Sequence, residues 1–183
     1  MAEDVTVLYH QHQLIYSLIV AGKAASFARE ALKRLFRDED PPFETVRGWI
    51  RKGCLMRKLK AARTGNYTKL SKALRQLVSV ENLDLTQCSI EDLEAFHGIG
   101  PKTARFFVLW TRPDAQCAAL DVHILRWLQS LGYDAPRQTP ASRKRYHELE
   151  EVFLKEAAIR RLTPANLDRK IWDAGVNGVV LAI

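Results

Sequence analysis

Two side chains of opposite charge, Lys102 and Asp121, lie nineteen residues apart in the second half of this sequence. Lys102 follows a Gly-x-Gly turn and a proline. A desolvated lysine near other positive charge has a lowered pKa, and its amine can attack a sugar C1′ to form a Schiff base. A carboxylate facing the same carbon can stabilise an oxocarbenium-like sugar and handle protons. Each residue also has a plainer interpretation, because Lys102 could simply contact a phosphate and Asp121 could cap a helix.

The turn before Lys102 is expected to join two helices. Ser89, with Asp92 three residues later, has the pattern of a helix N-cap, and Pro101 suits the first position of the next helix. The two glycines between these helices would let a nucleic-acid backbone come close, and the N–H groups that open the second helix could hold a phosphate. Gly-x-Gly alone is weak evidence, since ordinary helix connections also use glycine.

Helical periodicity extends along nearly the whole chain, and strand signals are almost absent. Helices are predicted over 11–36 with a break at 21–23, over 43–53, in the segment CLMRKLKAAR, and in the segment that follows Thr64-Gly65-Asn66. Thr139-Pro140 and Thr163-Pro164 each have the pattern of a cap residue followed by a proline helix start. The pattern predicts an all-α fold.

Composition sets further bounds. The 183 residues are 47% hydrophobic and 27% charged, which fits one domain or two small lobes with a real core. The net charge of +7 favours a polyanionic partner without proving one. No apolar run reaches the roughly 20 residues that cross a bilayer, and the N-terminus is unlike a secretory signal, so no membrane association and a cytoplasmic location are expected. Cys54, Cys88 and Cys117 are expected to be buried thiols.

With these features in order, the sequence resembles a known superfamily. FHGIGPKTARFFVLW followed by RPDAQCAALDVHILRWL is similar to the helix-hairpin-helix, Gly/Pro-rich loop, aspartate (HhH-GPD) superfamily of base-excision DNA glycosylases, most of all the endonuclease III and 8-oxoguanine glycosylase branches. The resemblance implies a two-lobed helical bundle within a single domain, 1–183. Residues 24–131 would form the central lobe with the hairpin and residues 1–23 plus 132–183 the second, with a cleft between them.

The resemblance also implies roles for individual residues. Lys102 falls where bifunctional members carry their Schiff-base lysine, and Asp121 falls on the catalytic aspartate, so base excision followed by β-elimination is expected. The hairpin residues expected to bind DNA phosphate are Gly98, Gly100 and Thr103. The expected partner is double-stranded DNA with a modified base, bound by a monomer that would be associated with the nucleoid.

Cofactor expectations follow from the same comparison. No cofactor is expected to be required, although in the family hairpin carbonyls often hold a monovalent cation, Na⁺ or K⁺, here those of Glu94, Phe96 and Ile99. His97 replaces the usual proline before the hairpin glycine, so the turn could differ slightly. The four-cysteine iron–sulfur loop of endonuclease III and the extra β-domain of eukaryotic 8-oxoguanine enzymes are absent from the sequence, so no iron–sulfur cluster is expected.

The excised base must be flipped into a pocket. The sequence gives candidate lining residues for this pocket but does not show how they come together. They are Gly22, Lys23, His123, Trp172 and Asp173, for each of which the plainer interpretation, a structural or surface residue, is the favoured one. A basic run could follow the DNA backbone or form a solvated helix face: Arg51, Lys52, Arg57, Lys58, Lys60 and Arg63. Two other functions stay open, a glycosylase without lyase activity and a non-catalytic helix-hairpin-helix DNA-binding protein.

Overall fold

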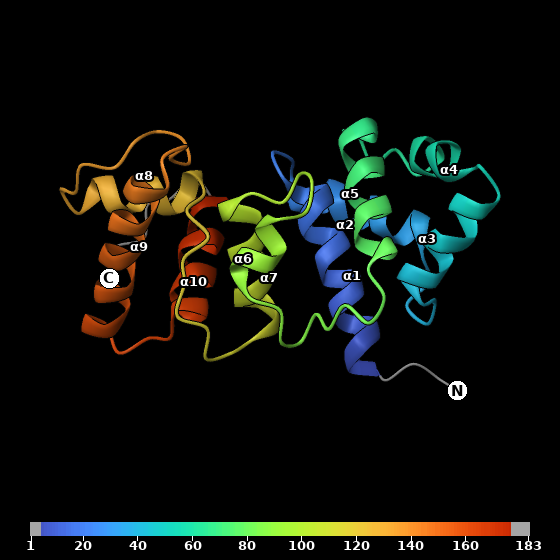
Figure 1. The fold of residues 1–183 in the computed structure, drawn as a ribbon. Helices are drawn as coiled ribbons and strands as arrows, with labels where there is room; N and C mark the ends of the chain where they lie inside the picture. Colours follow the sequence, from blue (N-terminus) through green and yellow to red (C-terminus); the bar gives the residue numbers. More distant parts are fainter. Residues whose placement is uncertain (1–4, 177–183) are drawn as a thin grey trace. The chain divides into compact units, whose positions relative to one another are not determined.

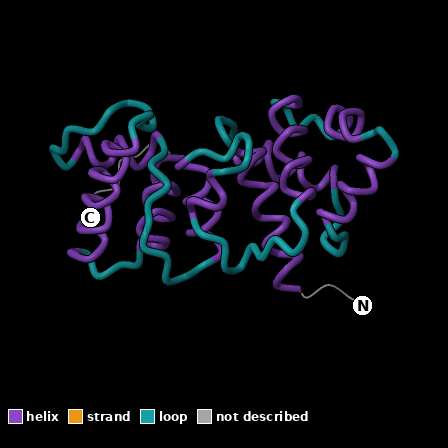
Figure 2. The backbone as a smooth tube through the Cα atoms, in the orientation of Figure 1, coloured by secondary structure: helices purple, strands orange, loops and turns teal. Residues whose placement is uncertain are grey.

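The computed structural model describes residues 5–176, and these form ten helices without a strand (Figures 1 and 2). The all-α prediction is confirmed. The expected break in the first helical segment is also present, because α1 (Val5–Val20) and α2 (Ala25–Leu35) are separated by a turn in which Gly22 has φ +72°. Positive φ is the conformation that favours glycine, so this residue ends α1 at little steric cost.

The chain divides into two compact units, residues 1–103 and 104–183, with the boundary inside α7. These limits differ from those of the lobes expected from the sequence. The assignment of residues to lobes and the cleft between them stay predictions.

The first unit is built on helices that pack through apolar faces. α1 packs against α2 and α3, and α5 packs against α3 and α4. Leu14, Leu70 and Leu74 are completely or almost completely buried in this unit, in agreement with the helical spacing of its apolar residues. Its remaining helices are α3 (Pro42–Arg51), α4 (Leu55–Ala61), α5 (Tyr67–Ser79) and α6 (Ile90–Glu94).

The second unit has its own core. α10 (Pro164–Val176) packs against α8 (Val122–Ser130) and α9 (Arg143–Ile159). Trp127 and Phe153 are buried at its centre, with ring centroids 6.2 Å apart in an edge-on arrangement. α7 (Pro101–Thr111) precedes these helices in the chain.

One of the two predicted proline helix starts is wrong. α10 begins at Pro164, and the Thr163 hydroxyl accepts a hydrogen bond from the Asn166 N–H at 3.2 Å, as expected. α9 does not begin at Pro140, because its N-cap is Ser142, whose hydroxyl accepts from the Arg145 N–H. The Thr139 hydroxyl instead donates to the carbonyl of Leu120 at 2.7 Å. The Thr139 side chain, which the sequence pattern assigned to a local helix cap, therefore bonds a distant backbone carbonyl instead.

The three cysteines are buried free thiols, as predicted. No described helix is long and apolar enough to cross a lipid bilayer.

Candidate functional site

The hairpin predicted around the Gly-x-Gly turn is present between α6 and α7. α6 opens with a capping box, in which the Ser89 hydroxyl accepts from the Asp92 N–H at 3.0 Å and the Asp92 carboxylate accepts from the Ser89 N–H at 2.9 Å. Pro101 is the first residue of α7, as its fixed φ and missing N–H favour. The sequence therefore fixes both ends of the hairpin through local interactions.

The two glycines of the hairpin are there for different reasons. Gly98 has φ +82°, a backbone conformation that favours glycine, and a Cβ atom at this position would lie 2.9 Å from Cε of the flexible Lys69 side chain. Gly100 has no positive φ, and a Cβ atom there would meet nothing within 4 Å. The protein itself does not require glycine at 100, which is consistent with close approach of an external group at that point.

His97 stands where proline is usual in the superfamily that the sequence resembles, and its backbone N–H makes a structural contact. Its N–H donates to the side-chain oxygen of Gln76 on α5 at 2.6 Å. Proline has no N–H and could not make this bond. The hydrogen bond ties the hairpin to α5, and the imidazole itself is exposed.

Lys102 lies in the first turn of α7, where its side chain is partly exposed, and Thr103 beside it is buried. The hairpin also contains the carbonyls expected to hold a monovalent cation. The Phe96 oxygen accepts from the Ile99 N–H at 3.1 Å, which leaves its second lone pair for another partner. The Phe96 carbonyl can therefore accept such an ion as a further partner, and the cation site formed with Glu94 and Ile99 stays a prediction.

Asp121 is the N-cap of α8 and keeps one carboxylate oxygen for other use. Its Oδ1 accepts from the N–H groups of His123 and Ile124, at 2.9 Å and 3.0 Å. Its Oδ2 makes no hydrogen bond with any residue that the structure describes, and the side chain is partly exposed. The capping role expected from the sequence is confirmed, and it does not exclude a chemical role for the second oxygen.

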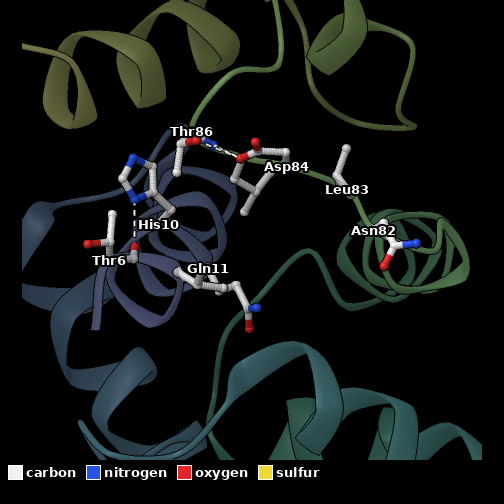
Figure 3. Close-up of a pocket in the computed structure, with 9 residues that line it drawn as sticks. Thr6, His10, Gln11, Asn82, Leu83, Asp84 and Thr86 are labelled. Carbon is white, nitrogen blue, oxygen red and sulfur yellow. Dashed lines mark hydrogen bonds between the residues drawn. The ribbon is translucent and has the colours of Figure 1, made fainter. Parts of the chain in front are cut away.

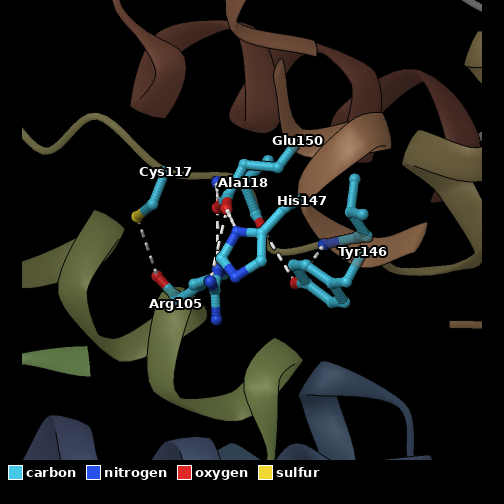
Figure 4. Close-up of polar contacts among 7 residues, drawn as sticks. Arg105, Cys117, Ala118, Tyr146, His147 and Glu150 are labelled. Carbon is cyan, nitrogen blue, oxygen red and sulfur yellow. Dashed lines mark hydrogen bonds and ion pairs between the residues drawn. The ribbon is translucent and has the colours of Figure 1, made fainter. Parts of the chain in front are cut away.

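The segment that leads into Asp121 is held by the buried side chain of Tyr146 on α9, which Figure 4 shows beside Ala118, and by Thr139 of the α8–α9 loop. The Tyr146 hydroxyl accepts from the Leu120 N–H at 3.1 Å and donates to the Ala118 carbonyl at 2.8 Å. The Thr139 hydroxyl bonds the Leu120 carbonyl. These three bonds fix the extended backbone immediately before Asp121, and burial raises the pKa of the Tyr146 phenol well above its usual range.

A buried ion pair supports the same segment. Arg105 on α7 donates through Nε to Glu150 Oε1 at 2.7 Å and through Nη2 to Oε2 at 3.2 Å. Oε1 also accepts from the Ala118 N–H at 2.9 Å, and the guanidinium lies 4.6 Å from the centre of the Tyr146 ring. Both charges are therefore paired and hydrogen-bonded, which a buried ion pair requires. Sequence reasoning missed this network, whose members lie up to 45 residues apart.

The candidate base-pocket residues are divided between the two units. Gly22 and Lys23 lie in the α1–α2 turn of the first unit. In the second unit His123 packs against α10, since a Cβ atom on Gly175 would lie 2.1 Å from its Nδ1. On that helix Trp172 is partly buried and Asp173 exposed. His123 therefore lies beside α10, and a pocket built from all five candidates stays a prediction.

The basic run on α3 and α4 is exposed along its length, as either interpretation requires: Arg51, Lys52, Arg57, Lys58, Lys60 and Arg63. Arg51 pairs with Glu44 at 3.0 Å, and Lys58 Nζ lies 5.7 Å from the centre of the Trp49 ring.

A separate cavity of about 380 Å³ lies in the first unit between α1 and the loop after α5 (Figure 3). Its polar contacts are local: His10 Nδ1 bonds the Thr6 carbonyl at 2.7 Å, and Asp84 accepts from the N–H and hydroxyl of Thr86. No residue predicted for the functional site lines it.

Comparison with known proteins gives a match in structure. No family model matches the sequence. The crystal structure of Methanocaldococcus jannaschii 8-oxoguanine glycosylase/lyase in complex with a 15mer DNA containing 8-oxoguanine is similar at a TM-score of 0.71 and 23% identity, over 96% of this chain and 84% of that one. The crystal structure of Methanocaldococcus jannaschii 8-oxoguanine DNA glycosylase is similar at a TM-score of 0.71 and 21% identity, over 96% and 81%. The chain therefore has the fold of this 8-oxoguanine glycosylase.

Proposed function

We propose that this protein is a DNA glycosylase that removes a modified base from double-stranded DNA and then cleaves the strand by β-elimination. The observation that carries the proposal is the hairpin with Lys102 in the first turn of α7, followed by Asp121 at the N-terminus of α8, in a chain with the fold of an 8-oxoguanine glycosylase/lyase. The net charge of +7 agrees with a polyanionic partner.

The proposed chemistry assigns one step to each group. The Lys102 amine attacks C1′ of the deoxyribose while the glycosidic bond breaks, and the departing base takes the bonding electrons and a proton. The charged Asp121 carboxylate stabilises the positive charge that develops on the sugar. The C1′–O4′ bond then breaks, O4′ takes the remaining amine proton, and a Schiff base is left on Lys102. A C2′ proton passes to water, and the 3′ phosphate leaves with the electrons of the C3′–O bond.

The hydrogen bonds of Asp121 support this role. Because only Oδ1 serves as the helix cap, Oδ2 is left to face a sugar cation. The bonds from Tyr146 and Thr139 to the preceding residues hold the backbone at that point, and preorganised charge is what makes such stabilisation effective.

The experiment that tests the proposal is a screen of DNA duplexes, each with a single modified base, scored separately for free base and for strand nicking. The set includes 8-oxoguanine, oxidised pyrimidines and bulky modified bases. We expect release of at least one base together with nicking by the wild-type protein. Base release without nicking would select a monofunctional glycosylase, and binding without release of any base would select a non-catalytic DNA-binding protein.

Asp121→Asn is the matched variant for this screen. Asparagine caps a helix as well as aspartate does, so the variant keeps the hydrogen bonds to His123 and Ile124 but loses the charge. We expect its free energy of unfolding to stay within about 0.5 kcal/mol of wild type, as for substitutions that break no buried contact, while base release is lost. Normal base release by this stable variant would remove Asp121 from the mechanism.

A further inference from the structure

Three turns of the first unit meet around two lysines outside the catalytic pair. They are the α1–α2 turn, which carries Lys23, the α4–α5 turn, which contains Gly65, and the hairpin, which contains Gly98. The second lysine, Lys69, lies in the first turn of α5. A Cβ atom on Gly65 would lie 2.8 Å from Lys23 Cε, and one on Gly98 would lie 2.9 Å from Lys69 Cε. Each lysine stem therefore lies across a glycine of a neighbouring turn.

Both lysines lie at the start of α5, because the Lys23 stem crosses Gly65 and Lys69 follows that glycine by four residues. Partial burial lowers the pKa of Lys23, and the charge of Lys69 lowers it further. The Lys23 Nζ donates to the Ile19 carbonyl at 3.1 Å and lies 5.8 Å from the centre of the Phe27 ring. These contacts orient the amine without neutralising it.

No carboxylate forms an ion pair with Lys23 or Lys69 among the residues that the structure describes. Lys33 on α2 differs, because Glu30 lies 3.9 Å from its Nζ. Two cations at this place without a counter-ion repel each other, and an anion bound by both would remove that cost. A lysine offers a phosphate a compact point charge with three donors.

We propose that Lys23 and Lys69 together bind one backbone phosphate of DNA, beside the phosphate expected at the N–H groups of the hairpin. The inference rests on the proposed function for its ligand and extends it, because it adds a second anchoring point that reaches from the hairpin to the α1–α2 turn. Lys23 is then a phosphate ligand and not part of a base pocket. Gly65 and Gly98, which both have positive φ, leave room for the two stems to lie across their turns.

The test is the salt dependence of binding to an unmodified DNA duplex, measured by fluorescence anisotropy between 50 and 200 mM KCl. Each phosphate neutralised contributes about 0.9 to the slope of log K against log salt concentration. Lys69→Met and Lys23→Met keep the apolar stems and remove the charges. Because both lysines hold the same phosphate, we expect the double variant to lose about 0.9 from the slope and not twice that amount.

Lys33→Met is the matched control, since this lysine lies in the same unit but already has an acidic neighbour, and its slope should equal that of wild type. Lys69→Arg should keep the wild-type slope. Thermal unfolding of each variant verifies that it is folded, and removing one of two repelling cations leaves the fold intact. A double methionine variant that is folded and keeps the full slope would overturn the inference.

The outcome separates this inference from the proposed function. A wild-type protein that binds no duplex at any salt concentration contradicts the proposed function. Salt-dependent wild-type binding with unchanged slopes in the methionine variants contradicts only the lysine phosphate site.

Discussion

Tyr146→Phe is the change that most sharply tests how the backbone before Asp121 is held. It removes one oxygen and leaves a ring that is 1% exposed and still lies against the Arg105 guanidinium. The Ala118 carbonyl and the Leu120 N–H lose their hydroxyl partner in a buried place. Each buried polar group left unsatisfied costs about 1–3 kcal/mol, and water admitted to the site offsets part of it, so we expect a loss of about 2–3 kcal/mol in the free energy of unfolding.

This loss is measured by urea unfolding followed by circular dichroism, with Tyr67→Phe as the control. The Tyr67 hydroxyl makes no hydrogen bond with the residues that the structure describes, so its removal should change stability by less than about 0.5 kcal/mol. Single-turnover base release by folded Tyr146→Phe should slow by up to about 100-fold, the effect of an ångström-scale displacement of a catalytic group. Equal stability of Tyr146→Phe and wild type would refute the reasoning.

Three further predictions concern other parts of the molecule. Gly100→Ala should leave thermal stability unchanged or slightly raised, since its Cβ meets nothing within 4 Å, yet weaken DNA binding in an anisotropy titration; unchanged affinity would contradict close approach at this residue. Burial, and then the charge of Glu150, raises the pKa of Cys117 to about 12, so native protein at pH 8 should resist iodoacetamide at this thiol, whereas rapid labelling in peptide mapping would show that the site opens. The hydrogen bond from Tyr133, and then Arg160, lowers the pKa of Glu156, so its charge stabilises the fold above about pH 4.5 and that contribution is lost as the pH falls through the lowered pKa. Glu156→Gln should therefore be less stable than wild type at pH 7, with a difference in urea unfolding that shrinks below pH 4.5; a difference independent of pH would contradict this.

Local signals account for the features that the sequence predicted well. The Ser89–Asp92 capping box, the start of α7 at Pro101 and the cap at Asp121 each depend on residues within three positions of one another. The helical spacing of buried leucines such as Leu70, Leu74 and Leu77 also needs only the local chain. These signals define both ends of the hairpin and the element that carries the candidate aspartate.

Contacts between distant residues account for what the sequence did not predict. Nothing near Thr139 indicates that its hydroxyl bonds Leu120, so the Thr-Pro pattern was interpreted wrongly as a helix start. Similarly, Gln76 bonds the His97 N–H, and Lys69 crosses Gly98, only because α5 packs beside the hairpin. Such partners are set by tertiary packing, which one sequence without its fold does not specify.

The measurement that tests the central claim most directly is borohydride trapping on a duplex that contains 8-oxoguanine, or the best base from the duplex screen, followed by peptide mapping of the adduct. The account predicts a covalent protein–DNA adduct on the peptide that contains Lys102, and Lys102→Gln should abolish it while most DNA binding remains. An adduct of normal yield in Lys102→Gln, mapped to another amine, would contradict the assignment.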